Sequence, residues 1–245
     1  MVLRREELEE RKDRILAVTI DHYIKTVTPV GSSYVAKTCA LDLSSATIRN
    51  ILAELEQEGF LTHPHTSAGR VPTELGYRYY VDNLMNEIQM LQEERERIKA
   101  EYTQASVELE QLLDKTSEVI AQTTQYTSII SVDGWGSKIF CKGTSFVVEY
   151  PEYQDIAKIR GILLALDQKE SLLEIINRDL EKKMNIYIGH EMALREIDHC
   201  SLVVTPYKTK DGASGRIAVL GPTRMDYGRV ISTLGYFTNL MEEIE

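Results

Sequence analysis

The sequence predicts an α+β protein in which a helical N-terminal part precedes a C-terminal part that alternates helices with strands. Three observations carry this prediction. Apolar residues recur at helical spacing in the first part, no glycine or proline lies between Tyr77 and Asp133, and short apolar runs bounded by turn residues follow residue 134. A chain of 245 residues is long enough for two modest domains, and the predicted boundaries are 1–76, 77–133 and 134–245.

The first part opens with two predicted helices. Leu16, Ile20 and Ile24 lie on the apolar stripe of the first helix, which the segment 29–31, Pro-Val-Gly, should end. Ser32 is expected to be the N-cap of a short second helix. The two helices leave room for only a tight link before the next helical pattern begins.

A third helix and a hairpin complete this part. Ser44 or Ser45 should cap the helix, Gly59 should end it, and its apolar face contains Ile48, Leu52 and Leu55. Short strand signals at 60–62 and at Val71 flank a tip of small residues. Three helices followed by such a hairpin are typical of a winged helix-turn-helix, which reads DNA with its third helix and its wing.

The residues at the start of the third helix and in the hairpin have the chemistry of DNA contacts. Ser44, Ser45 and Thr47 can hydrogen-bond phosphates or base edges, Arg49 suits guanine and Asn50 suits adenine. Arg70, after a glycine at the tip, suits a narrow minor groove. The predicted DNA surface comprises Ser32, Ser44, Ser45, Thr47, Arg49, Asn50, His65, Thr66, Ser67, Gly69, Arg70 and Arg78. The alternative is an ordinary capped surface helix beside a hairpin whose histidines are neutral.

The net charge of −10 does not by itself indicate a nucleic-acid binder. Residues 1–80 contain 10 Lys and Arg against 11 Asp and Glu, whereas residues 81–245 contain 18 against 27. The first part is therefore nearly neutral, and Arg49, Arg70 and Arg78 can act as a local patch because salt screens charges beyond about 10 Å. The acidic remainder should weaken non-specific binding to DNA.

The middle of the chain carries a heptad pattern. Apolar residues alternate at spacings of four and three over several repeats, which is typical of a coiled-coil-like linker helix. A helix of about 40 residues would be ~60 Å long. Two interpretations remain open: the helix packs on its own C-terminal domain, or it pairs with a second subunit to form a homodimer. The second assigns the dimer contact to Leu84, Leu91, Ile98 and Leu112.

The C-terminal part is predicted to be an α+β domain with an antiparallel sheet. Amphipathic helices are expected over 156–166, 172–180 and 230–240, and strands over 186–189, 201–204 and 217–220. Cys39, Cys141 and Cys200 lie among apolar neighbours and are expected to be reduced structural thiols.

Several classes of protein are not expected. The five histidines lack partners at metal-ligand spacing, so no metal site is predicted. The sequence has no phosphate-binding loop, dinucleotide fingerprint or nucleophile elbow, so neither a cofactor nor an enzyme is expected. No apolar run suits a membrane span, and the charged start does not resemble a signal peptide. The expected location is the cytoplasm.

Four segments together resemble the HrcA family of bacterial heat-inducible transcription repressors. They read LSSATIRN at 43–50, HTSAGRVPT at 65–73, GYRYYVD at 76–82 and VLGPTRMDY at 219–227. The resemblance implies a dimer that binds an inverted-repeat operator, CIRCE, ahead of chaperone operons such as groE and dnaK. It also implies that a GroEL-type chaperonin promotes the active state until heat diverts it. The family's C-terminal domain is similar to GAF domains and carries an inserted dimerising segment.

The chain is shorter than typical members of this family. The shortfall is expected between the long helix and about Ser137, so the GAF-like domain should be reduced and the heptad helix should take a larger share of dimerisation. Two rival functions stay open. One is a winged-helix repressor that senses a small metabolite through the GAF-like domain, and the other is a scaffold that assembles through the coiled coil without binding DNA.

Overall fold

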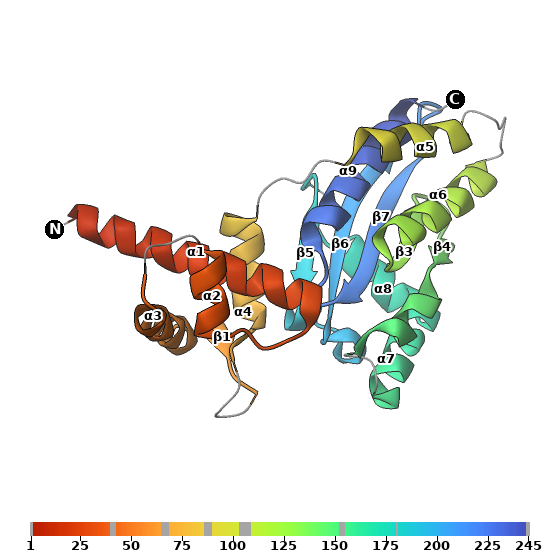
Figure 1. Ribbon diagram of the computed structural model, residues 1–245. Helices are drawn as coiled ribbons and strands as arrows, with labels where there is room; N and C mark the ends of the chain where they lie inside the picture. The colour runs from red at the N-terminus through yellow and green to blue at the C-terminus, as the bar shows by residue number, and fades with distance from the viewer. Residues whose placement is uncertain are drawn as a thin grey trace. The chain divides into compact units, whose positions relative to one another are not determined.

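The computed structural model describes residues 2–39, 43–64, 69–85, 90–102, 109–151, 155–179 and 181–243. The chain divides into two compact units, Met1–Asn86 and Glu87–Glu245, which are considered separately (Figure 1). Helices and antiparallel sheets are both present, as expected for an α+β protein. No helix in these described ranges is both long enough and apolar enough to cross a membrane.

The described residues of the first unit form four α-helices, a two-stranded sheet and a π-helix. In chain order these are α1 (Val2–Thr26), α2 (Ser32–Thr38), α3 (Ser45–Gln57), β1 (Leu61–Thr62), β2 (Val71–Pro72), α4 (Glu74–Tyr79) and a π-helix (Tyr80–Leu84). The buried core combines residues from α1 and α3, among them Ile15, Ile20, Ile48 and Leu52. Strands β1 and β2 pair antiparallel, so the expected order of three helices and a hairpin is present.

The expected N-cap of the second helix is wrong by one residue. Gly31 is the N-cap of α2, with φ −92° and ψ 154°, and Ser32 is the first helical residue. The carbonyl of Gly31 accepts hydrogen bonds from the amides of Tyr34 and Val35, at 3.1 and 3.3 Å. The extended backbone at Gly31 therefore starts the helix without a side-chain cap.

The expected boundaries of the third helix are confirmed. The hydroxyl of Ser44 accepts a hydrogen bond of 3.1 Å from the amide of Thr47, which satisfies a donor in the first turn of α3. The helix ends at Gln57, and Gly59 follows with φ +84°, a backbone conformation that glycine adopts without steric cost.

The single long helix expected over 77–133 is wrong. After the π-helix, Met85 has extended backbone, and the following described elements are α5 (Gln92–Tyr102), α6 (Leu109–Thr124) and β3 (Thr127–Val132). Gln125 has φ +62°, which ends α6 before the strand begins.

The heptad residues consequently do not form one exposed seam. Ile98 is fully buried within the second unit, Leu84 and Leu112 are half-buried, and Leu91 is 73% exposed. The burial of Ile98 agrees with the interpretation in which the segment packs on its own domain. A role for Leu84, Leu91 and Leu112 in a dimer stays a prediction.

The second unit is built on a five-stranded antiparallel sheet of order β4-β3-β7-β6-β5. Its remaining strands are β4 (Ile139–Lys142), β5 (Asn185–Ile188), β6 (Cys200–Lys208) and β7 (Ser214–Pro222). Its remaining α-helices are α7 (Ile156–Asp167), α8 (Lys169–Ile176) and α9 (Tyr227–Glu243), and 3-10 turns lie at Thr144–Glu149, Gly189–Met192 and Arg195–Ile197. The predicted helices and strands of this region are present, except that the helix predicted over 172–180 ends at Ile176, and β3 and β4 were not expected.

Helices cover both faces of this sheet, as Figure 1 shows. On one face, Ile129, Leu202 and Ala218 join Ile162 of α7 and Leu172 of α8 in a buried cluster. On the other face, α6 and α9 pack on the strands: the Ser117 hydroxyl donates to the Ser128 carbonyl at 3.3 Å, and the hydroxyls of Ser201 and Tyr227 are 2.8 Å apart. All six residues of β3 are therefore buried.

Helix α5 packs against α9 in the same unit (Figure 1). The Tyr236 hydroxyl donates a hydrogen bond of 2.9 Å to the Arg95 carbonyl, and the Arg95 guanidinium lies 5.9 Å from the centre of the Tyr236 ring. These contacts hold α5 on the second unit, and Ile98, about one helical turn after Arg95, is fully buried.

Candidate nucleic-acid interface

The first turns of α3 present a polar surface backed by an apolar one. Ser44, Ser45, Thr47, Arg49 and Asn50 are all exposed. The opposite side of the same helix is buried through Ile48, Ile51, Leu52 and Leu55. Packing of this apolar side fixes the helix, and the exposed side leaves hydroxyl, guanidinium and amide groups available to a ligand. The structure thus brings together five of the predicted site residues.

The hairpin is attached to the first unit through its second strand. Leu61 pairs with Pro72 and Thr62 with Val71, while Arg70 and Val30 exchange backbone hydrogen bonds of 2.8 and 2.9 Å. This bridge brings the backbone at Gly69 so close that a Cβ there would lie 2.6 Å from the Val30 carbonyl. Gly69, predicted as a DNA contact, is needed for this close approach.

The Arg70 guanidinium is held by a carboxylate of α3. Nη2 of Arg70 lies 2.7 Å from Oε2 of Glu56, and the two side chains are 23% and 24% exposed. The other carboxylate oxygen of Glu56 contacts Nδ1 of His63. Glu56 therefore links the last turns of α3 to both sides of the hairpin, and Arg70, which was predicted as a minor-groove contact, is held in an ion pair.

Sequence reasoning missed Glu56, although one signal was present. Glu56 lies on the third helix between the buried Leu55 and the helix end, and the hairpin that folds back on that end carries both His63 and Arg70. A carboxylate facing two basic side chains across a tight connection could have been proposed from this order alone.

The remaining predicted DNA contacts have different positions. Arg78 lies on α4, where its Nη1 is 3.3 Å from Oδ1 of Asp82, and Ser32 is half-buried at the start of α2. His65, Thr66 and Ser67, which the prediction places at the hairpin tip, lie outside the described residues.

A threonine joins the end of the hairpin to the end of α3. The Thr73 hydroxyl donates to the Gly59 carbonyl at 2.6 Å and accepts a hydrogen bond of 3.1 Å from the amide of Gly76. A Cβ at Gly76 would lie only 2.2 Å from the Phe60 carbonyl oxygen. Thr73 and Gly76, which belong to the segments 65–73 and 76–82 quoted for the family resemblance, therefore shape the hairpin instead of facing a ligand.

Polar contacts from α1 hold the end of α3 and the residues that follow the hairpin. Nζ of Lys12 lies 2.7 Å from Glu58 and 3.1 Å from Glu54, and these carboxylates, chiefly Glu58, raise the pKa of Lys12. The hydroxyls of Tyr79 and Tyr80 donate to carboxylates of α1, at 2.9 and 2.6 Å. The arrangement makes α1 the support on which α3 and the hairpin rest.

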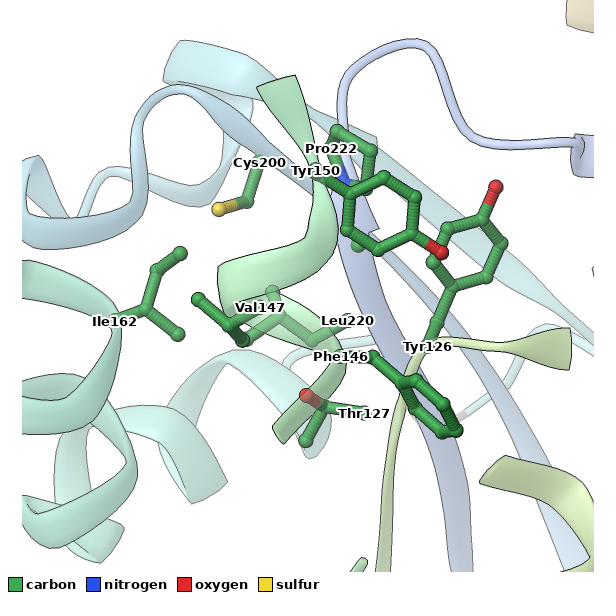
Figure 2. Close-up of a pocket in the computed structure, with 10 residues that line it drawn as sticks. Tyr126, Thr127, Phe146, Val147, Tyr150, Ile162, Cys200, Leu220 and Pro222 are labelled. Carbon is green, nitrogen blue, oxygen red and sulfur yellow. The ribbon is translucent and has the colours of Figure 1, made fainter. Parts of the chain in front are cut away.

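The second unit contains a small apolar cavity that bears on the rival metabolite-sensing function. Figure 2 shows it between Tyr126, Phe146, Val147, Tyr150 and Cys200, and its volume is about 10 Å³. A space of that size holds about one water molecule. Burial raises the pKa of Tyr150, whose hydroxyl donates to a backbone carbonyl. This cavity is therefore part of the packed core.

Comparison with known proteins identifies relatives over nearly the whole chain. The family model described as the HrcA protein C terminal domain matches residues 82–231. Heat-inducible transcription repressor HrcA of Acetivibrio thermocellus is 30% identical over 336 positions that cover 96% of each chain. The protein of the same name from Symbiobacterium thermophilum is 27% identical over 336 positions, which cover 97% of this chain and 98% of that protein.

One solved structure shares the fold. It is a crystal structure of a hypothetical protein at 2.2 Å resolution, with a TM-score of 0.78 and 17% sequence identity, and the match covers 95% of this chain and 97% of that one.

The alignments also show that this chain lacks internal segments that its relatives have. An alignment of 336 positions exceeds the 245 residues of this chain, yet it spans nearly all of both proteins. The difference therefore lies in internal gaps, which agrees with the expectation of a shortened interior. Its placement before Ser137 stays a prediction.

Proposed function

Because this chain belongs to the HrcA family, whose relatives carry the name heat-inducible transcription repressor, we propose that its first unit is a winged helix-turn-helix that binds double-stranded DNA and represses transcription. The observation that carries the proposal is the start of α3, where five exposed polar residues stand over a fully packed apolar side. Such a helix can enter a major groove without loss of its own support.

In this proposal α3 reads bases and its flanks position it. Arg49 pairs with a guanine edge and Asn50 with an adenine edge, because their donor and acceptor patterns match those bases in the major groove. Ser44, Ser45 and Thr47 hydrogen-bond phosphates near the helix N-terminus, where the helix dipole also favours negative charge. These contacts fix the register of the helix on the duplex.

The hairpin serves as the wing. Its tip, with His65, Thr66 and Ser67, follows the phosphate backbone next to the groove that α3 occupies, and Ser32 and Arg78 supply further phosphate contacts. Arg70 joins them only when the phosphate field competes with its ion pair to Glu56. Glu56 would then reduce the attraction of the wing for DNA of any sequence.

We further propose that the repressor acts as a dimer on an inverted repeat of the CIRCE type ahead of chaperone operons. Two-fold symmetric proteins match two-fold symmetric operators, with half-sites about one helical turn or a multiple apart. Bound near a promoter, the dimer would block transcription sterically, and heat would release it. A GroEL-type chaperonin is the proposed partner that maintains the active state, and the site of action is the bacterial cytoplasm, at the nucleoid.

Substitution of Arg49 tests the reading role of α3. Arg49→Ala should weaken binding to the operator by about 1–3 kcal/mol, which is roughly 5- to 150-fold, and relax preference at one base position. Binding to scrambled duplex should fall much less. Arg97→Ala, which removes the same charge from an exposed position of α5, is the matched control.

The measurement is a fluorescence anisotropy titration against operator and scrambled duplexes at several salt concentrations. An equal loss on both duplexes would contradict base reading by Arg49. If the wild-type chain showed no salt-dependent binding to any inverted repeat, the proposal of a DNA-binding repressor would fail, and the scaffold interpretation would gain support.

A further inference from the structure

Helix α7 of the second unit, labelled in Figure 1, exposes several apolar side chains. Ile156 is 80% exposed, Leu163 45% and Leu164 39%, and Val148 on the adjoining 3-10 turn is 64% exposed. Four of the eight exposed large hydrophobic residues in the described ranges thus belong to this one region. Contiguous exposed apolar residues are typical of a surface that another molecule covers.

The exposed residues of α7 share one side of the helix. At 3.6 residues per turn, the positions of Ile156, Arg160, Leu163, Leu164 and Asp167 fall within an arc of about 100°. The opposite side is occupied by Ile162, Ala165 and Leu166, which are buried in the core of the unit. The exposed side is therefore available while the other side anchors the helix.

Two opposite charges flank the leucines symmetrically. Arg160 and Asp167 are both exposed and lie equally far from the midpoint between Leu163 and Leu164. In an antiparallel pair of α7 helices with a two-fold axis at that midpoint, Leu163 would face Leu164 of the second copy. Each Arg160 would face Asp167 of the other copy, so the contact would contain two such pairs of opposite charges. The sequence of this face is thus complementary to itself, which is the requirement for an isologous contact.

A groove of about 510 Å³ adjoins this face. Its lining combines small and apolar residues of α7 with charged or titratable side chains: Ala157, Gly161, Leu164, Lys158, Arg160, Arg195, Glu196, Asp198 and His199. A Cβ at Gly161 would lie 2.5 Å from the Glu196 carbonyl oxygen, so the helix is seated close to the far wall of the groove.

We propose that this face of α7 is the homodimer contact of the protein and that its occupant is α7 of a second copy of the same chain. The inference rests on the proposed function, because an inverted repeat requires two reading units. The balanced charges of Arg160 and Asp167 fit a copy of the same face, whereas a nucleic acid would require a basic surface.

Charge reversal in trans tests the contact. Arg160→Asp and Asp167→Arg should each raise the dimer dissociation constant at least 10-fold in sedimentation velocity of the full chain. An equimolar mixture of the two variants should restore the dimer, because each variant then meets the opposite charge on its partner. Glu174→Arg, an exposed charge reversal on α8, is the control that should leave the dimer unchanged. Leu163→Asp should give monomers that remain folded by circular dichroism, because Leu163 is outside the core.

Several results would overturn the proposal. Dimers that persist in Leu163→Asp, or charge variants that associate like the wild type, would show that the contact lies elsewhere. A monomer produced by Leu91→Asp instead would place it at the heptad residues. Loss of GroEL binding by Leu163→Asp, with the dimer intact, would assign the face to the chaperonin.

The same variants separate this proposal from the proposed function. A monomeric Arg160→Asp protein that still binds a single half-site would support both the α7 contact and DNA binding. An intact, trans-complementing dimer without DNA binding would leave the contact standing and refute the function.

Discussion

Replacement of Glu56 by glutamine probes how the hairpin is held and how it meets DNA. In the structure one carboxylate oxygen of Glu56 is 2.7 Å from the Arg70 guanidinium and the other contacts His63. The substitution keeps the size of the side chain and a hydrogen-bonding oxygen, but it removes the negative charge. It should therefore loosen the hairpin and at the same time make Arg70 more available to phosphate.

The magnitude follows from the partial burial of the pair. Exposed ion pairs contribute about 0–1 kcal/mol and hydrogen bonds to charged groups about 1.5–3 kcal/mol. Both side chains of this pair are about one quarter exposed, and Nε of Arg70 is buried without a hydrogen-bond partner among the described residues. We expect a cost of about 1–2 kcal/mol for hairpin closure, or a rise of roughly 5- to 30-fold in amide exchange there.

Two assays measure the two consequences. Hydrogen exchange followed by mass spectrometry should show faster exchange of β1 and β2 in Glu56→Gln. Anisotropy titrations against scrambled duplex should show tighter binding and a slope of log affinity against log salt that is steeper by up to about 0.9, because one more cation is free to contact phosphate. Glu54→Gln removes the same charge from the same helix but leaves Arg70 paired, so it is the control.

The reasoning is refuted if Glu56→Gln and Glu54→Gln behave alike in both assays. Equal exchange in the hairpin would mean that the ion pair does not hold the wing. An unchanged salt slope with weaker binding would mean that Glu56 does not compete with DNA for Arg70.

Three further predictions concern stability and reactivity. Gly76→Ala should lower the free energy of unfolding by about 1–3 kcal/mol in circular dichroism melts, because the added carbon would lie 2.2 Å from the Phe60 carbonyl oxygen. The control Gly235→Ala has open space around the added carbon and should be neutral or slightly stabilising, so equal effects of the two substitutions would contradict this reasoning. Burial lowers the pKa of His199, so below about pH 6.5 the unfolded state binds more protons than the folded state, and the free energy of unfolding falls on acidification. His199→Gln should flatten the dependence of the free energy of unfolding on pH in this range, and an unchanged slope would count against a role for His199. Burial raises the pKa of Cys141 to about 11, so iodoacetamide at pH 8 should modify it far more slowly in the native than in the urea-unfolded protein; equal rates would disprove a protected thiol.

Local sequence signals predicted the elements whose boundaries are set by single residues. The hydroxyl at Ser44 and the glycine at position 59 define α3, and both predictions are confirmed, because capping and left-handed backbone depend on neighbours within a few positions. Strands β6 and β7 were predicted in position but are longer than expected, since their outer residues are paired across the sheet and do not stand out in sequence.

The failure at β3 has a different physical cause. The absence of glycine and proline suggested one continuous helix, but Gln125 adopts the left-handed conformation and Thr127–Val132 pairs with β4 and β7. The β-branched residues of that run were a signal for a strand. The heptad pattern left two interpretations open because apolar spacing records which residues are buried and not the molecule that buries them; Ile98 packs within its own unit, and a dimer role for the other heptad residues stays a prediction.

The exposure of the predicted residues on α3 is observed, whereas the ion pair of Arg70 on the hairpin was not predicted, and the role of these residues in DNA binding stays a prediction. The chemistry of Arg49 and Asn50 is visible in the sequence, because exposed polar residues at the start of an amphipathic helix need no long-range contact. The pairing of Arg70 with Glu56 depends on how the chain returns to the end of α3 after Gly59, and helical periodicity contains no information about that return.

The cavity between Phe146 and Tyr150 is almost filled by the domain itself, and its volume of about 10 Å³ limits what the domain can detect there. A small molecule shifts an equilibrium only through unequal affinity for two states, and a space for one water offers a metabolite no bound state to prefer. This cavity therefore gives no support to metabolite sensing, and a small-molecule ligand of the second unit would have to bind at another surface.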